Sequence, residues 1–288
     1  MPTQHVSVLL NESVSFFGAL KSGGIIVDCT VGGGGHAEAF LSEYAQARLI
    51  GVDRDAKALE VAQKRLKKFG SRVTLVEANF SELDSVLDRV KVEEVDAVFA
   101  DLGMSSFQLD DERRGFSFQK RAPLDMRMGL NTKSAWDVLN SYPEEEISRI
   151  IYEYGEERFS RRIAHRIVES RPVRTTEELS RLVILSMPQA ARKRWKSTLR
   201  RVFQAIRIEV NDELENLKSL LEISLKRLKS GGRIAIISFH SLEDRMVKRA
   251  FMGEGFAVIT KKPVIPSQLE RLDNPKSRSA KLRVAEKV

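Results

Sequence analysis

The regular alternation of short apolar segments with helical ones is the feature of this sequence that most restricts its fold. Strands are predicted at residues 25–29, 48–52, 73–77 and 95–100, and helices at 36–44 and 56–69. Short apolar strands separated by helical crossovers are typical of a parallel sheet that is covered on both faces. We therefore predict an α/β fold whose ligands bind beyond the carboxyl ends of the strands.

The alternation stops near Ser105 and resumes near Arg207. The stretch between them is rich in Arg and Glu and has apolar residues at helical spacing, which predicts an inserted helical domain. After it we predict a helix at 211–228, a helix stop at Gly231 and Gly232, and a strand at 233–238. A helix at 242–251 and strands at 256–260 and 281–287 follow. The predicted domains are a core of 1–104 with 208–288, and the insert 105–207.

Positive charge is concentrated in the insert. The whole chain has a formal net charge of +8, and the segment from Arg158 to Arg207 contains 14 Lys and Arg against 3 Glu. Cationic side chains gain affinity for phosphates by releasing condensed counterions, so a polyanionic partner is expected. One basic cluster also contains an aromatic ring suited to stacking on an unpaired base of RNA: Arg192, Lys193, Arg194, Trp195, Lys196, Arg200 and Arg201. The alternative is that this cluster is a solvated helix face.

Several classes of protein are disfavoured by the composition. No apolar run approaches the roughly 18 to 20 residues of a membrane span, and the first residues lack the pattern of a signal peptide. The single cysteine, Cys29, allows no internal disulfide, and the histidines and this cysteine show no metal-ligand spacing. We expect a cytoplasmic protein with no metal and no membrane partner. Whether it is a monomer or a homodimer stays open.

Polar residues and glycines at the predicted strand ends indicate a cofactor site. Gly32 to Gly35 follow the first strand, where glycine lets the backbone approach a ligand closely. Asp53 ends the second strand and can accept hydrogen bonds from both hydroxyls of a ribose. Phe80 follows the third strand, where it can lie against adenine, and Asp101 follows the fourth. The structural alternatives are a tight turn, a helix cap at Asp53 and ordinary packing of Phe80.

Motifs along essentially the whole chain resemble those of one enzyme family. They are HVSVLL at 5–10, GGGGH at 32–36, DLGMSSFQLD at 101–110, RGFSF at 114–118, PLDMRM at 123–128, YGEERFSRRIA at 154–164, FQAIRIEVNDEL at 203–214, SFHSLEDR at 238–245 and NPKSRSAKLR at 274–283. In this order they make the chain similar to the MraW (RsmH) family of 16S ribosomal RNA cytosine N4-methyltransferases.

The resemblance implies a class I Rossmann-like methyltransferase with a mostly parallel seven-stranded sheet and an inserted substrate-recognition domain. It implies S-adenosyl-L-methionine as the methyl donor. The implied acceptor is N4 of one cytidine in the 16S ribosomal RNA of the small ribosomal subunit, near the decoding centre. The cofactor-binding positions that the resemblance implies are Gly33, Gly34, Gly35, His36, Asp53, Phe80, Asp101 and Gln108.

This reaction sets requirements for the side chains around the acceptor nitrogen. The lone pair of cytosine N4 is delocalised into the ring, so hydrogen-bond acceptors must localise it and take its proton. Asp101 can accept from this amine, or it can hold the methionine amino group of the cofactor. In the second case Ser105 and Ser106 are the candidates that orient N4. His240 is a further candidate proton acceptor, or else it stabilises the loop that closes the site.

Two other classes of protein remain as alternatives. A nicotinamide oxidoreductase is favoured by the G-x-G-x-x-A spacing of Gly32, Gly34 and Ala37, and it is disfavoured by the 101–106 turn and the basic insert. A non-catalytic RNA-binding or ribosome-assembly factor would bind RNA without turnover. Methylation of DNA or of a protein is a nearer alternative.

Overall fold

The computed structural model describes residues 7–104, 111–129 and 132–288, and its fold divides into two units. The first unit consists of Met1–Gly103 and Leu214–Val288, and the second of Met104–Glu213. Among the helices of the described ranges, none has the length and apolar content needed to cross a membrane.

A seven-stranded sheet lies at the centre of the first unit, with the strand order β3-β2-β1-β4-β5-β7-β6. The strands are β1 (Gly24–Asp28), β2 (Ala47–Asp53), β3 (Val73–Glu77), β4 (Val95–Asp101), β5 (Leu228–Ser238), β6 (Phe256–Val258) and β7 (Lys281–Lys287). Strands β1 to β5 pair in parallel, whereas β7 is antiparallel to both β5 and β6. The predicted α/β fold with a mostly parallel seven-stranded sheet is confirmed.

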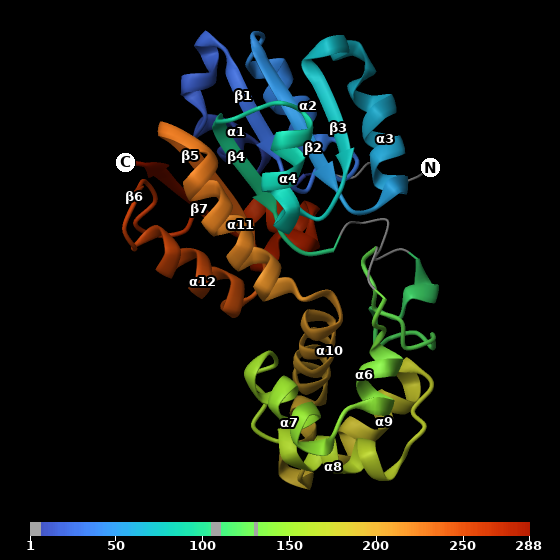
Figure 1. Ribbon diagram of the computed structural model, residues 1–288. Helices are drawn as coiled ribbons and strands as arrows, with labels where there is room; N and C mark the ends of the chain where they lie inside the picture. The colour runs from blue at the N-terminus through green and yellow to red at the C-terminus, as the bar shows by residue number, and fades with distance from the viewer. Residues whose placement is uncertain (1–6, 105–110, 130–131) are drawn as a thin grey trace. The chain divides into compact units, whose positions relative to one another are not determined.

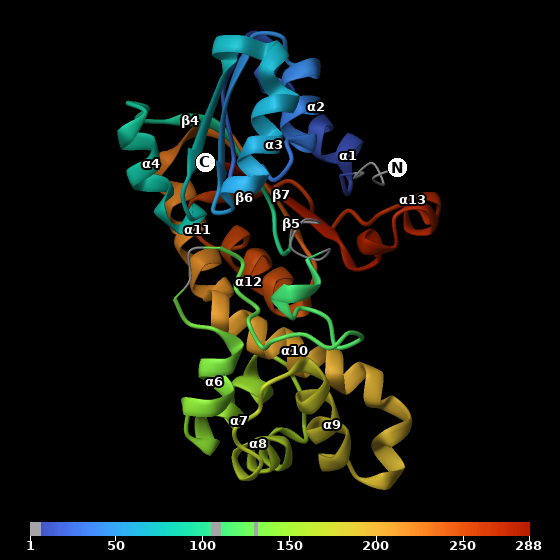
Figure 2. The same cartoon turned by 90° about the vertical axis from the view of Figure 1, so that its right-hand side faces the viewer.

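Helices cover both faces of this sheet, as Figure 1 shows. They are α1 (Leu10–Ser15), α2 (Gly35–Glu43), α3 (Ala56–Leu66), α4 (Leu83–Arg89), α11 (Glu213–Arg227), α12 (Ser241–Phe251) and α13 (Gln268–Asp273), with the 3-10 helices η1 (Gly18–Ser22), η2 (Lys67–Arg72), η3 (Phe80–Glu82) and η6 (Pro275–Ser279). Figure 2 shows α2 and α3 on one side of the sheet and α4 and α11 on the other. Because neighbouring residues of a strand point to opposite faces, Ile26 joins the core that contains Phe40, and Val27 joins the core that contains Leu217.

The predicted helix stop at Gly231 and Gly232 is wrong. Helix α11 ends at Arg227 and β5 follows at once, so both glycines lie inside the strand. The pairing of β5 with β4 is irregular there, and a Cβ on Gly232 would lie only 2.8 Å from the carbonyl oxygen of Lys229. Glycine is therefore required at a kink within the strand rather than at the end of a helix.

The described part of the second unit is helical, as predicted. It contains α6 (Ala135–Ser141), α7 (Glu144–Glu153), α8 (Ser160–Glu169), α9 (Thr176–Ser186) and α10 (Trp195–Asn211), with the 3-10 helices η4 (Glu112–Arg114) and η5 (Gln189–Arg194). Apolar residues that recur at helical spacing form one core, to which Ile147, Ile150, Ile163, Ile167 and Ile206 belong. This core explains the apolar periodicity of the insert.

Helix α10 continues past the predicted end of the insert. Val210 still packs into the core of the second unit, and the Asn211 side-chain amide donates a 2.8 Å hydrogen bond to the carbonyl oxygen of Met126. The chain then turns at Asp212, whose φ is 48°, and the predicted helix 211–228 is observed as the continuous helix α11, which begins two residues later, at Glu213. The units divide after residue 213 rather than after 207, and after residue 103 rather than 104.

Candidate functional site

Three carboxylates lie at one edge of the sheet. Asp28 ends β1, Asp53 ends β2 and Asp101 ends β4, and these strands are parallel neighbours. The carboxyl ends of parallel strands meet at the same edge, which is where open α/β sheets bind their ligands. The structure thus brings the predicted Asp53 and Asp101 together. Asp28 is absent from the predicted set, although its place at the end of the first strand could have located it.

Positive backbone φ angles shape the turn between β1 and α2. The φ angle is 51° at Gly32 and 81° at Gly34, in a region that favours glycine. A Cβ on Gly35 would lie 2.2 Å from Ser7 Oγ, so a side chain here would require the Ser7 hydroxyl to move. Gly33 lies between them and is half-buried. The N-cap residue Gly34 provides no side-chain hydrogen bond to α2. The first backbone N–H groups at the N-terminus of α2 therefore favour an anionic group.

The segment before α1 packs over this turn. His36 Nε2 lies 2.9 Å from the carbonyl oxygen of Val8, and because a carbonyl only accepts, Nε2 carries the proton. The His36 ring packs against Phe99, with the ring centroids 4.6 Å apart. The next residue, Leu9, donates its backbone N–H to Glu270 Oε1 on α13 at 2.8 Å. His36 therefore stabilises the turn, and the same segment joins the turn to α13.

Backbone N–H groups fix both carboxylate oxygens of Asp53. Oδ2 accepts from Gly32 at 2.8 Å, and Oδ1 accepts from Asp55 at 2.9 Å. Burial raises the pKa of Asp53, and these two hydrogen bonds oppose the shift because they favour the charged form. A carboxylate has about four lone-pair sites, so Asp53 keeps acceptor capacity for further donors in a fixed orientation.

The Asp28 side chain is buried and that of Asp101 is 20% exposed, and each has one buried oxygen that is unsatisfied. Within the described residues, neither Asp28 Oδ2 nor Asp101 Oδ1 has a hydrogen-bond partner. Burial and the negative charge of Asp53 raise the pKa of Asp28 to about 7. Burial, followed by the charges of Asp28 and Glu243, raises the pKa of Asp101. Unsatisfied buried acceptors of this kind gain from a cationic hydrogen-bond donor, so this edge can accommodate a positively charged ligand group.

Two predicted cofactor positions, Phe80 and Gln108, and two predicted catalytic residues, Ser105 and Ser106, remain to be located. Phe80 follows β3, is half-buried and packs against the core beneath α4, which fits both ordinary packing and a place beside adenine. Ser105, Ser106 and Gln108 lie outside the described residues.

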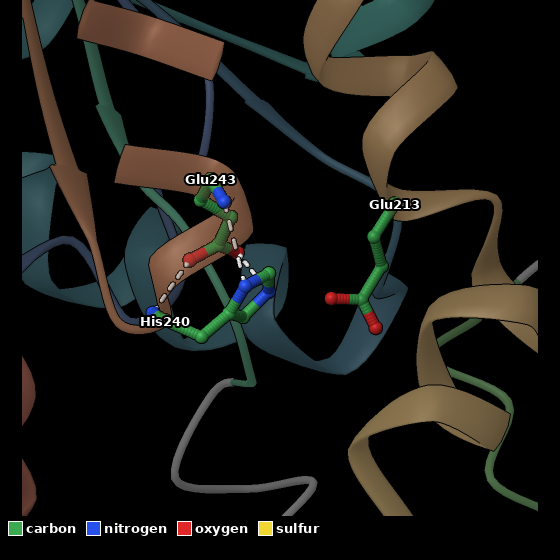
Figure 3. A group of neighbouring side chains, drawn as sticks. All are labelled: Glu213, His240 and Glu243. Atoms are coloured by element: carbon green, nitrogen blue, oxygen red, sulfur yellow. Dashed lines mark hydrogen bonds and ion pairs between the residues drawn. The ribbon is translucent and has the colours of Figure 1, made fainter. Parts of the chain in front are cut away.

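His240 caps helix α12, as Figure 3 shows. Its Nδ1 accepts from the backbone N–H of Glu243 at 3.4 Å, while Glu243 Oε2 accepts from the backbone N–H of His240 at 3.2 Å. His240 Nε2 lies 3.2 Å from Glu243 Oε1. With Nδ1 accepting, the proton of the neutral ring sits on Nε2, so neither nitrogen offers a free lone pair. These contacts define a capping role, and proton acceptance by His240 remains a prediction.

The basic cluster lies on η5 and the first two turns of α10, in the second unit. Six of its seven residues are exposed, namely Arg192, Lys193, Arg194, Trp195, Lys196 and Arg200. Trp195 is 37% exposed, and Lys196 Nζ lies 5.4 Å from the centre of its ring. An exposed aromatic ring among cations is suited to contacts with the bases and phosphates of RNA.

Arg201 differs from the rest of this cluster. Its Nη2 donates a 2.6 Å hydrogen bond to Glu157 Oε2, and the Glu157 side chain is fully buried. A buried carboxylate requires a partner, so this guanidinium has a structural function in addition to any contact with RNA. Contact of Arg201 with RNA remains a prediction, and its 40% exposed side chain is compatible with it.

The replacement Arg201→Ala is expected to lower the free energy of unfolding by about 2 kcal/mol, because it leaves the buried Glu157 carboxylate without its cation while water still reaches the half-exposed position. Urea unfolding measures this change. The matched control is Arg200→Ala, which removes the same charge from the exposed neighbour and should change stability by no more than about 0.5 kcal/mol. Equal effects of the two replacements would contradict the structural role of Arg201.

A mixed seven-stranded sheet with this strand order, carrying a glycine turn and acidic strand ends at one edge, is the fold of the class I methyltransferases. The chain belongs to the MraW methylase family, whose model matches residues 2–288. The resemblance seen in the sequence is thus confirmed, and the protein is a methyltransferase whose methyl donor is S-adenosyl-L-methionine.

Close relatives cover the chain from end to end. A ribosomal RNA small subunit methyltransferase H from Carboxydothermus hydrogenoformans is 48% identical over 311 aligned residues, which cover 100% of this chain and 99% of that protein. The protein of the same name from Thermotoga neapolitana is also 48% identical, with 99% of this chain and 96% of that protein covered.

The replacement His240→Asn is expected to leave both the stability and the pH profile of methyl transfer unchanged, because Asn is a favourable N-cap residue that can accept from the Glu243 N–H. The replacement His240→Ala removes the acceptor and should lower the free energy of unfolding by about 1 kcal/mol. Urea unfolding and pH–rate profiles of both variants test this. A shifted pH profile in the Asn variant, at unchanged stability, would instead assign proton transfer to His240.

Proposed function

We propose that this methyltransferase modifies N4 of one cytidine in the 16S ribosomal RNA of the small ribosomal subunit, near the decoding centre, in the cytoplasm. The observation that carries the proposal is that relatives at 44–49% identity, aligned over 98–100% of the chain, are named ribosomal RNA small subunit methyltransferase H. The cationic cluster on η5 and α10 supports a nucleic-acid substrate on independent physical grounds.

The carboxyl edge of the sheet is the proposed site for S-adenosyl-L-methionine. Asp28 and Asp101 have unsatisfied buried oxygens that fit the cationic amino group, and the end of α2 at Gly35 fits the carboxylate. Asp53 has the fixed orientation and the spare acceptor capacity that two ribose hydroxyls require. When bound, the cofactor supplies an electrophilic methyl group on a sulfonium.

The other cofactor positions are proposed from the family resemblance. Gly33 and Gly34 form the close-approach turn, His36 supports it from beneath, Phe80 lies beside adenine, and Gln108 completes the set. We add Asp28 to this set because its buried Oδ2 atom has no hydrogen-bond partner within the described residues.

The acceptor amine requires hydrogen-bond acceptors rather than a strong base, because loss of its proton accompanies attack on an already activated methyl group. If Asp101 holds the cofactor amino group, Ser105 and Ser106 are the proposed residues that orient N4. His240 is the alternative proton acceptor, which a shifted pH profile of the His240→Asn variant would identify. Asp101 can serve either role, since one of its oxygens lacks a partner within the described residues.

The proposed RNA contacts are Arg192, Lys193, Arg194, Trp195, Lys196, Arg200 and Arg201, and the second unit is the proposed substrate-recognition domain. Loss of one phosphate contact should weaken RNA binding and reduce its salt dependence by about one unit of slope.

Incubation with radiolabelled S-adenosyl-L-methionine and small ribosomal subunits that lack the modification tests the function directly. After digestion of the RNA to nucleosides, the expected product is labelled N4-methylcytidine. Label in another nucleoside would correct the acceptor atom. Absence of label from RNA, with cofactor binding intact, would overturn the RNA substrate and direct the search to DNA, to a protein or to a non-catalytic role.

A further inference from the structure

The second unit contains a pocket of about 230 Å³ that none of the predicted cofactor positions lines. It lies between the loop that joins α7 to α8 and the segment from η5 into α10. The loop contains the start of the YGEERFSRRIA motif. No residue of this motif belongs to the proposed cofactor site. Residues of the pocket that bear on its chemistry are Glu156, Arg158, Phe159, Arg194, Thr198 and Arg201.

The size of the pocket suits one planar ring system. A dry engineered cavity of about 150 Å³ accepts benzene, and pockets for drug-sized molecules begin near 300 Å³. A volume of about 230 Å³ lies between these limits, so it is large enough for a single substituted aromatic ring.

The chemistry of the lining suits a nucleotide. Three of the residues are arginines, Arg158, Arg194 and Arg201, against one acidic residue, Glu156. The guanidinium carbon of Arg158 lies 4.7 Å from the centre of the Phe159 ring, so a cation and an aromatic ring are in contact at the wall of the pocket. Unpaired bases of RNA stack on aromatic rings and on guanidinium planes, and arginines bind phosphates.

Close backbone contacts hold the loop between α7 and α8, which forms one wall of the pocket, against α10. A Cβ on Gly155 would lie 2.6 Å from the carbonyl oxygen of Ile151 and 2.8 Å from that of Arg201, so only glycine permits the loop to approach α10 so closely. Glu156 has a φ of 50°, which is unfavourable for a side chain with a Cβ. The buried Glu157 then pairs with Arg201. Strain that is held by surrounding contacts in this way clusters at ligand-binding sites.

We propose that this pocket binds one unpaired nucleotide of the RNA substrate, with the base against Arg158 and Phe159 and the phosphate on the arginines. This proposal rests on the proposed RNA substrate. We assign it the role of a recognition nucleotide, and the pocket lining contains none of the residues proposed to hold the methyl donor. The YGEERF loop thereby contributes to the choice of substrate.

The affinity of the full-length protein for unmodified 16S ribosomal RNA, measured by filter binding, tests the proposal. We expect Arg194→Ala to weaken binding about tenfold, in line with the loss of one stacking or bidentate contact to a nucleotide. The matched control is Arg181→Ala, which removes an equal charge from an exposed position on α9 that does not line the pocket. Its effect should be less than about twofold, because a single screened surface charge contributes little.

A second pair of variants separates stacking from charge. Phe159→Ala should weaken RNA binding about tenfold, and Phe159→Tyr, which keeps the ring, should bind as the unmodified protein does. Thermal unfolding and S-adenosyl-L-methionine binding should be unchanged in Phe159→Tyr and Arg194→Ala. Equal losses in Arg194→Ala and Arg181→Ala, or unchanged binding in both pocket variants, would overturn the proposal.

Ultraviolet cross-linking of the same RNA to the full chain locates the contact directly. The proposal expects nucleotide adducts on peptides that contain residues 156–159 or 189–194, and adducts confined to other segments would overturn it. These readouts are independent of turnover. RNA that binds through the pocket but is not methylated would therefore refute the proposed function alone, whereas methylated RNA with no pocket contact would refute the pocket alone.

Discussion

Replacing Asp28 with Asn is expected to stabilise the ligand-free protein near pH 8 by up to about 4 kcal/mol and to change little near pH 4. Burial and the charge of Asp53 raise the pKa of Asp28 from 3.8 to about 7 in the folded protein. Between these values the folded protein holds a proton that the unfolded chain releases, so this group makes stability fall as the pH rises. An Asn side chain is neutral at every pH and can still accept from the Thr30 N–H.

Urea unfolding at the two pH values measures the effect. The control is Asp273→Asn, which neutralises an exposed carboxylate on α13 and should have little effect at either pH. The same stability gain for Asp28→Asn at both pH values would contradict a buried carboxyl that ionises with difficulty. The variant should also bind S-adenosyl-L-methionine less well, since it loses the negative charge proposed to face the amino group; a gain in stability at the expense of binding is typical of functional sites.

The replacement Asp53→Ala is expected to lower the affinity for S-adenosyl-L-methionine about a hundredfold. Charge-assisted hydrogen bonds contribute about 1.5–3 kcal/mol each, and the ribose offers two donors. The same carboxylate orders the glycine turn through the N–H of Gly32, so its removal also disturbs the neighbouring contacts. Isothermal titration calorimetry with the cofactor gives the affinity directly.

The matched control for this change is Glu77→Ala. Glu77 ends β3 directly opposite Asp53 in the sheet but is exposed, so its removal should change the affinity less than about threefold. Equal affinities of the Asp53 variant and the unmodified protein, with both folded, would exclude Asp53 as the residue that binds the ribose.

The sheet could be predicted from the sequence because its central strands are buried on both faces. Continuous apolar runs such as the one that ends at Asp101 distinguish buried parallel strands from surface elements. Asp53 could be predicted for the same reason, because it lies at the end of the apolar strand β2. Asp28 was missed because the glycines beside it offered a sufficient explanation for the turn, and the raised pKa depends on burial that no local pattern reveals.

Contacts between distant residues account for most of what the sequence did not predict. Arg201 reads as one more cation in a basic cluster, and its partner Glu157 is 44 residues earlier in the chain. The start of α11 was predicted to within two residues, whereas the continuation of α10 to Asn211 was not, because that continuation depends on packing into the core of the second unit. His240 is a different case, since its spacing to Glu243 resembles a capping box with His in place of Ser or Thr, and this signal was available.

The hydrogen bond from Leu9 to Glu270 has a consequence for how the protein is made. The segment that packs over the glycine turn leaves the ribosome long before its partner on α13 is synthesised. Strands β5 and β7 also come late, after the whole second unit. Because domains form as their parts emerge during synthesis, the helical unit can fold while the sheet is still incomplete. The sheet whose carboxyl ends form the proposed cofactor site is therefore completed only after β5 and β7 have emerged, and the contact of Leu9 with α13 forms equally late.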